Sequence, residues 1–89
     1  MREILIGETT DQTENGESYT CEYRLLVRET EGRFSCESYG VRVTLKRSGE
    51  SSELWDITMH AGRIEELMTM LMRNTVTPCT LVDVVQDWL

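Results

Sequence analysis

The sequence predicts an α+β fold: an antiparallel four-stranded meander followed by two C-terminal helices packed on one face of the sheet (β-β-β-β-α-α). Two observations predict it. Between residues 19 and 45, apolar side chains alternate with polar ones, as in strands that bury one face and expose the other. After residue 60 the apolar side chains recur every 3 or 4 residues, which is typical of amphipathic helices.

The first predicted strand is short, residues 2–7. A polar connector, residues 8–17, follows it and contains the turn signal Asn15-Gly16. The long second strand then runs to a turn at Glu31-Gly32. Its predicted buried face carries Tyr19, Cys21, Tyr23, Leu25 and Val27. Its solvent-facing side carries Thr20, Glu22, Arg24, Leu26 and Arg28, among which Leu26 is the apolar exception.

The third strand changes phase along its length. Its first apolar residues, Phe34 and Cys36, have even numbers. Its later ones have odd numbers: Tyr39, Val41, Val43 and Leu45. A strand cannot move its apolar residues to the other face without an extra residue, so we predict a β-bulge within residues 37–40, where Gly40 relaxes the backbone.

A final strand is predicted over residues 54–59, with Trp55, Ile57 and Met59 on one face. The first helix follows, and its apolar stripe is Ile64, Leu67, Met68, Leu71 and Met72. Either Thr58 or His60 begins this helix, and we expect Asn74 to end it in the left-handed conformation.

The second helix begins either with Thr77 as cap and Pro78 in the first turn, or with Thr80 as cap and Asp83 three residues later. Its predicted buried face is Leu81, Val84, Val85 and Trp88.

Length and charge exclude several functions. The chain has 89 residues, which suits one domain spanning residues 1–89. Its net charge of -7 disfavours nucleic acids and anionic membranes, both of which recruit basic side chains. The second helix is also unsuited to DNA, because Asp83 and Asp87 would face phosphates. We expect a cytoplasmic protein, since no signal peptide or membrane-length apolar run is visible and the three cysteines form no CxxC pair.

One segment partly matches a calcium-binding EF-hand loop. Oxygen-bearing side chains recur at the required spacing around Gly16, and they belong to Asp11, Thr13, Asn15, Glu17 and Glu22. Thr at the third position is a weak ligand, and strands instead of helices flank the loop. A polar connector closing on an Asn-Gly turn is therefore the preferred interpretation, and we expect no metal and no cofactor.

The remaining reactive residues do not form a catalytic set. Cys21 and Cys36 lie inside alternating strands and are predicted to be core thiols. Cys79 lies near a helix N-terminus, which stabilises a thiolate, but no base accompanies it. His60 is the sole histidine and stands at a strand–helix junction. We therefore predict that the chain is not an enzyme.

The solvent-facing side of the sheet is the predicted interaction surface. Leu26 lies in its middle, and Arg24, Arg28 and Arg42 surround it. An exposed apolar residue within a polar surface can mark a partner or dimer contact. The edge of the short sheet offers a second route, through strand addition.

Two parts of the chain have a family resemblance. The segments are YRLLVRETEG followed by YGVRV, and the ending TVTPCTLVDVVQDWL. They resemble a family of short, uncharacterised bacterial proteins in which a β-meander precedes a Thr/Ser-Pro connector and a terminal D-V-V-x-D-aromatic-Leu helix. The resemblance implies the fold above and assigns no activity or site residue; Cys79-Thr80 departs from the family pattern.

These observations together favour a small interaction or regulatory domain. We expect it to act by binding another protein or a second copy of itself. The alternative is a small-ligand or calcium-binding module that uses residues 11–22.

Overall fold

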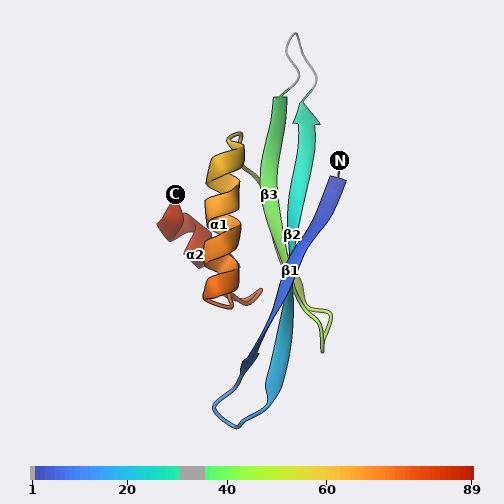
Figure 1. The fold of residues 1–89 in the computed structure, drawn as a ribbon, viewed down its shortest axis with the longest axis vertical. Coiled ribbons are helices and arrows are strands. Elements are labelled where there is room, and N and C mark those ends of the chain that lie inside the picture. Colours follow the sequence, from blue (N-terminus) through green and yellow to red (C-terminus); the bar gives the residue numbers. More distant parts are fainter. Residues whose placement is uncertain (1, 31–35) are drawn as a thin grey trace.

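The computed structural model of the chain describes residues 2–30 and 36–89. It consists of β1 (Arg2–Gln12), β2 (Ser18–Thr30), β3 (Cys36–Leu45), β4 (Ser51–Thr58), α1 (Ala61–Arg73) and α2 (Leu81–Trp88). The strands form one antiparallel sheet in the order β1-β2-β3-β4 (Figure 1). The predicted fold class, a four-stranded meander followed by two helices, is therefore confirmed.

The hairpin of β1 and β2 is longer than the sequence suggested. The strand predicted over 2–7 was too short and the connector predicted over 8–17 was too long, because β1 continues to Gln12 and pairs with β2. The turn itself lies where the Asn-Gly signal predicted it. Gly16 has a φ of 82°, and its amide donates to the carbonyl of Thr13. The two hairpin strands extend beyond the helices (Figure 1), so part of the sheet has no helical cover.

The core lies between one face of the sheet and the two helices. Helix α1 contacts all four strands, whereas α2 contacts β4. The predicted stripe of α1 is confirmed, with Ile64, Leu67, Met68 and Leu71 buried and Met72 half-buried. Leu81 and Val85 of α2 are also buried and complete the core. The side of the sheet that packs against the helices is called the inner face here, and the opposite side is called the outer face.

Tyr23 ties the sheet to the connector between the helices. Its side chain is fully buried on β2. The phenol donates a hydrogen bond to the carbonyl oxygen of Val76, 2.9 Å away, and accepts one from the Thr9 hydroxyl at 3.3 Å. Burial raises the pKa of Tyr23 from its usual 10 to about 12, because the charged phenolate would lose its hydration. The neutral phenol is therefore the form that the folded protein requires.

Alkaline pH is expected to destabilise the protein through Tyr23. The unfolded chain releases this proton near pH 10, whereas the folded chain holds it up to about pH 12. The stabilisation is complete below about pH 10 and is lost as the pH rises towards 12. Urea unfolding of the wild type and of Tyr23→Phe at pH 9 and pH 11.5 would measure this loss. If the free energy of unfolding fell by the same amount in wild type and Tyr23→Phe between these pH values, Tyr23 would not be the cause of the alkaline destabilisation.

The prediction of a bulge in the third strand placed it in the wrong strand. β3 pairs with β2 without interruption, from Cys36 opposite Thr30 to Leu45 opposite Cys21. The irregularity lies between β3 and β4, where Val41 pairs with Leu54 but Tyr39 pairs with Thr58. The extra residues therefore belong to β4, opposite Gly40. Phe34, which suggested the phase change, lies outside the described residues.

The helix ends resolve the alternatives that the sequence left open. His60 is the N-cap of α1 and Thr80 is the N-cap of α2. The expected left-handed conformation at Asn74 was wrong: its φ is -96°, and the next residue, Thr75, has a φ of 45°. Asn74 instead donates its side-chain amide to the carbonyl of Met70. Neither helix is long and apolar enough to cross a membrane, as judged over residues 2–30 and 36–89.

Candidate functional site

The structure places the predicted interaction surface on the outer face. Arg24 of β2 lies opposite Arg42 of β3. Two residues further along β2, Leu26 lies opposite Gly40. Arg28 continues the same side of β2. The expectation that Leu26 is exposed was wrong, because its side chain is 0% accessible. The centre of this surface is therefore a small second core.

Neighbours from β4 explain the burial of Leu26. Gly40, directly opposite, has no side chain, and a Cβ built there would lie 2.9 Å from Trp55 Cα. The bulged backbone of β4 thus passes over this position. Arg28, two residues after Leu26 on β2, has its guanidinium 4.9 Å from the centre of the Trp55 ring and pairs with Asp56 at 3.0 Å. These contacts close the outer face around Leu26.

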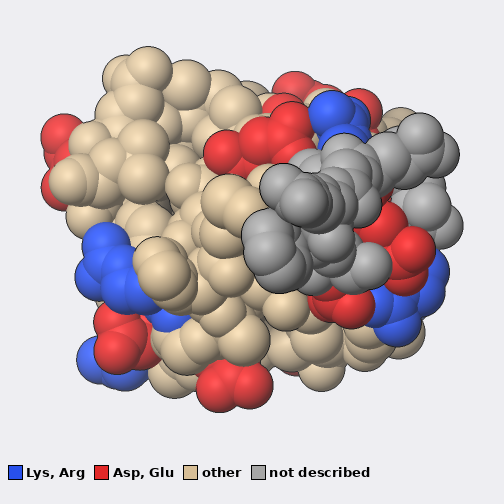
Figure 2. Space-filling model, turned by 90° about the horizontal axis from the view of Figure 1, so that it is seen from above, with Lys and Arg blue, Asp and Glu red and all other residues tan. Residues whose placement is uncertain are grey.

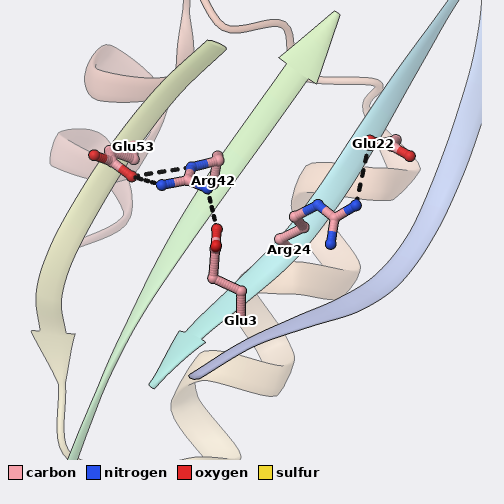
Figure 3. A network of polar contacts seen from close by, with 5 residues as sticks. All are labelled: Glu3, Glu22, Arg24, Arg42 and Glu53. Carbon is pink, nitrogen blue, oxygen red and sulfur yellow. Dashed lines mark hydrogen bonds and ion pairs between the residues drawn. The ribbon is translucent and has the colours of Figure 1, made fainter. Parts of the chain in front are cut away.

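Arg42 links three strands across the same region (Figure 3). Its Nε donates to a Glu53 carboxylate oxygen on β4 at 3.0 Å, and its terminal nitrogens pair with Glu53 and with Glu3 of β1. The hydrogen bonds from Arg42 lower the pKa of Glu53. Arg24 makes a single, longer ion pair with Glu22, at 3.7 Å. Arg42 is therefore a bridge within the protein, whereas Arg24 is held loosely.

The charged groups of this surface are largely satisfied inside the chain. Figure 2, which views the molecule from above, shows basic groups beside acidic ones at that end of the molecule as well. Pairs near the ends of the sheet follow the same pattern, as with Arg2 and Glu37 at 3.1 Å. A partner of the outer face would have to break these pairs before making its own, which weakens the case for the arginines as a binding site.

The hairpin separates the residues of the EF-hand-like segment. Asp11 lies in β1 opposite Tyr19, whereas Glu22 lies in β2 opposite Glu8. Three strand positions, roughly 10 Å, separate Asp11 and Glu22 along the ladder. Thr13 and Asn15 lie at the turn, and Glu17 pairs with Arg47 at 3.4 Å. No cluster of three or more acidic, cysteine or histidine side chains suited to a metal occurs within residues 2–30 and 36–89.

The three cysteines and the histidine lie in different environments. Cys21 is a core thiol as predicted, and burial raises its pKa. The same prediction was wrong for Cys36, which is half-buried and shares the outer face with Arg28 because β3 has no bulge. Cys79 is exposed, and its thiol donates to a Glu50 carboxylate oxygen at 3.6 Å. His60 is exposed at the start of α1.

A second candidate site, which the sequence reasoning did not locate, lies along β1. This strand forms one edge of the sheet and exposes three consecutive apolar side chains: Ile4 (41%), Leu5 (48%) and Ile6 (41%). The β1–β2 register shifts between Leu5 and Gly7, so Ile6 is an extra residue in the strand. Such a bulge can redirect a side chain. Ile6 faces α1 and not the solvent-facing outer side.

An apolar groove of about 370 Å³ runs between β1 and α1. We call it the edge groove. It is lined by Ile6, Leu25, Ile64, Glu65, Met68, Thr69 and Met72. Gly7 allows β1 to approach α1 closely, since a Cβ there would lie 3.2 Å from the sulfur of Met72. One feature of the sequence could have indicated this groove. Residues 4–6 are three consecutive apolar residues, whereas a strand with one solvent-facing side normally alternates apolar and polar residues.

Comparison with known proteins adds a family and no activity. A search of curated proteins and a search of solved structures each found no significant match. A family model described as a family of unknown function, DUF6514, matches residues 2–89. The match covers nearly the whole chain and agrees with the resemblance to uncharacterised proteins noted in the sequence. The chain therefore belongs to the DUF6514 family.

Proposed function

We propose that this chain is a non-catalytic protein-interaction domain that binds an extended segment of a partner along β1. One observation carries the proposal: an unpaired strand edge with exposed apolar side chains lies directly beside an apolar groove. Added strands bind through both features, since the edge supplies backbone hydrogen bonds and a pocket accepts alternate side chains.

The backbone of β1 is suited to strand addition. It has 11 residues, and β2 is its single strand partner within the part of the chain that the structure describes. Alternate residues of such an edge direct their N–H and C=O groups away from the sheet. The exposed run of Ile4, Leu5 and Ile6 lies in the first half of this strand. A partner strand would satisfy the backbone groups and cover these side chains together.

The opposite edge of the sheet is less suited to this role. β4 carries the irregularity opposite Gly40, and Asp56 within it has a left-handed φ of 54°. Bulges and kinks of this kind can protect an edge from pairing. β1 also has a bulge, but it consists of one extra residue, Ile6, whereas β4 has two extra residues and a left-handed residue at its irregularity. Helix α2 also contacts β4. The two edges therefore differ, and β1 is the accessible one.

The edge groove provides the specificity of the proposed contact. Its floor is apolar, and two of its lining residues are the methionines Met68 and Met72. Methionine side chains are flexible and adapt to different apolar groups. One apolar side chain of the partner, directed towards α1, would occupy this groove.

A matched pair of variants tests the proposal. Ile6→Glu places a charge in the edge groove, whereas Met59→Glu places one at an apolar residue of similar exposure (55%) outside the groove lining. Affinity selection from lysate followed by hydrogen exchange is the measurement. We expect a partner that wild type and Met59→Glu retain, that Ile6→Glu loses, and that protects β1 amides. A partner that binds Ile6→Glu as strongly as wild type would place the function elsewhere.

A further inference from the structure

We infer that the segment bound in the edge groove has an apolar anchor and a lysine or arginine two positions away from it, and that it belongs to another protein. This inference rests on the proposed function and specifies its partner. It is drawn from the charges around β1 and from one carboxylate on the rim of the groove that has no ion pair within the described part of the chain.

Glu65 is that carboxylate. It lies on α1, is exposed and lines the edge groove. Within residues 2–30 and 36–89 it has no ion pair or hydrogen bond from a side chain, whereas the adjacent Glu66 lies 3.7 Å from Arg63. A negative charge beside an apolar groove attracts a cation attached next to an apolar group. Glu65 is thus available to a ligand in a way that Glu66 is not.

The spacing of an added strand brings a cation to Glu65. Side chains two residues apart share one face of a strand and are separated by about 7 Å. Glu65 precedes Met68 by three residues, which is a rise of about 4.5 Å along the helix. When the anchor lies between Ile6 and Met68, the long side chain of a lysine or arginine two positions away reaches the Glu65 carboxylate.

The charges of β1 favour the same ligand. The strand contains Glu3, Glu8 and Asp11 against one basic residue, Arg2. Glu3 pairs with Arg42 and Glu8 with Lys46, so Asp11 is the β1 carboxylate without an ion pair among the described residues. Arg2 is already paired with Glu37. Asp11 and Glu65 are thus the carboxylates at this edge that no basic side chain of residues 2–30 and 36–89 pairs with, and the whole chain has a net charge of -7. A basic segment is therefore attracted to this edge, and an acidic one is repelled.

These charges also argue against a second copy as the occupant. Each copy has a net charge of -7, so two copies repel each other. Pairing β1 with β1 of a second copy would bring two acidic strands together. Arg2, the basic residue of β1, is already paired with Glu37 of its own copy and so does not offset this repulsion. A separate basic partner meets no such opposition.

A short peptide probe tests the inference with the full chain. The probe has seven residues, blocked at both ends: leucine at the centre, lysine two positions to either side and threonine elsewhere. Its sequence reads the same in both directions, so it fits a parallel or an antiparallel arrangement. The comparison peptide carries glutamate in place of lysine. We expect the lysine peptide to bind at least about tenfold more tightly and to shift β1 amide and Met68 methyl NMR signals.

Two protein variants and one modified peptide sharpen this test. Glu65→Gln is expected to weaken binding about two- to fivefold, the effect of one exposed charge pair, whereas Glu66→Gln removes the same charge one residue away and leaves binding unchanged. N-methylation of alternate backbone nitrogens in the lysine peptide keeps its side chains but prevents strand pairing, so binding should be lost.

Several outcomes would overturn the inference. Equal binding of the lysine and glutamate peptides, or equal effects of Glu65→Gln and Glu66→Gln, would remove the role of charge but leave the proposed edge contact standing. Signals that shift on the outer face in place of β1 would relocate the site. A dimer in sedimentation with protected β1 amides would make a second copy the occupant.

Discussion

Replacing Gly40 with alanine is expected to destabilise the fold by about 3 kcal/mol or more. A Cβ at this position would lie 2.2 Å from the carbonyl oxygen of Leu54 and 2.9 Å from Trp55 Cα. Both are backbone atoms and cannot rotate away as a side chain would. β4 would have to separate from β3 or lose its bulge. A domain of this length typically has about 4 to 13 kcal/mol of stability, so the change removes a large fraction.

Gly62→Ala is the matched control for this prediction. Gly62 lies in the first turn of α1, and nothing lies within 4 Å of a Cβ built there. Alanine favours a helix by up to about 1 kcal/mol over glycine, so this variant should be as stable as wild type or more stable. Urea unfolding followed by circular dichroism measures both variants. A Gly40→Ala protein with wild-type stability would show that β4 accommodates the methyl group without cost.

Leu26→Ala is expected to destabilise the protein by about 2 to 3 kcal/mol, although Leu26 lies on the solvent-facing side of the sheet. Its side chain is fully buried, and Leu26 lies between Glu3 of β1 and Gly40 of β3 in the sheet. Alanine would leave a cavity there. Because the site lies on the outer face, where surrounding side chains can relax into part of the cavity, the cost should fall at the lower end of the range for buried leucines.

Leu5→Ala separates burial from simple loss of apolar area. Leu5 also lies on the outer face, opposite Arg24, but 48% of it remains exposed. Its truncation should therefore change the free energy of unfolding by less than about 0.5 kcal/mol. Denaturation curves for the two variants, measured under identical conditions, provide the comparison. Similar losses for Leu26→Ala and Leu5→Ala would mean that Leu26 is not a core residue.

The sequence predicted the parts of the fold that depend on local patterns. The alternation around Tyr23 located β2 and its buried face, and the spacing from Ile64 to Leu71 located α1. The Asn15-Gly16 turn also lies where it was expected. Each of these signals is contained within a few neighbouring residues, so no knowledge of the rest of the chain was needed.

The errors have a common origin in contacts between strands. Phe34 and Cys36 suggested a bulge in β3, but Cys36 lies on the outer face of a regular strand. Gly40 does not relax its own strand; it makes room for the backbone of β4. A strand's own residues cannot reveal which of two paired strands holds the extra residue, because a register shift is a property of the pair.

The candidate site was predicted only in its type. Sheet edges were recognised as possible interaction routes, but the arginine surface around Leu26 ranked higher because Leu26 broke the polar pattern of β2. The structure instead buries Leu26 and pairs Arg42 with Glu3 and Glu53. The edge groove joins Ile6 to Met68, which are far apart in the sequence, so no local motif announces it.

The sequence by itself determined the order of the elements, the inner face of the sheet and the apolar stripes of both helices. These features follow from periodicity, which each segment expresses independently of the others. The tertiary structure alone decided that Leu26 is buried, that β4 carries the bulge and that β1 is an accessible edge beside a groove. These depend on which residues from distant segments become neighbours, and the side-chain pattern of one segment does not contain that information.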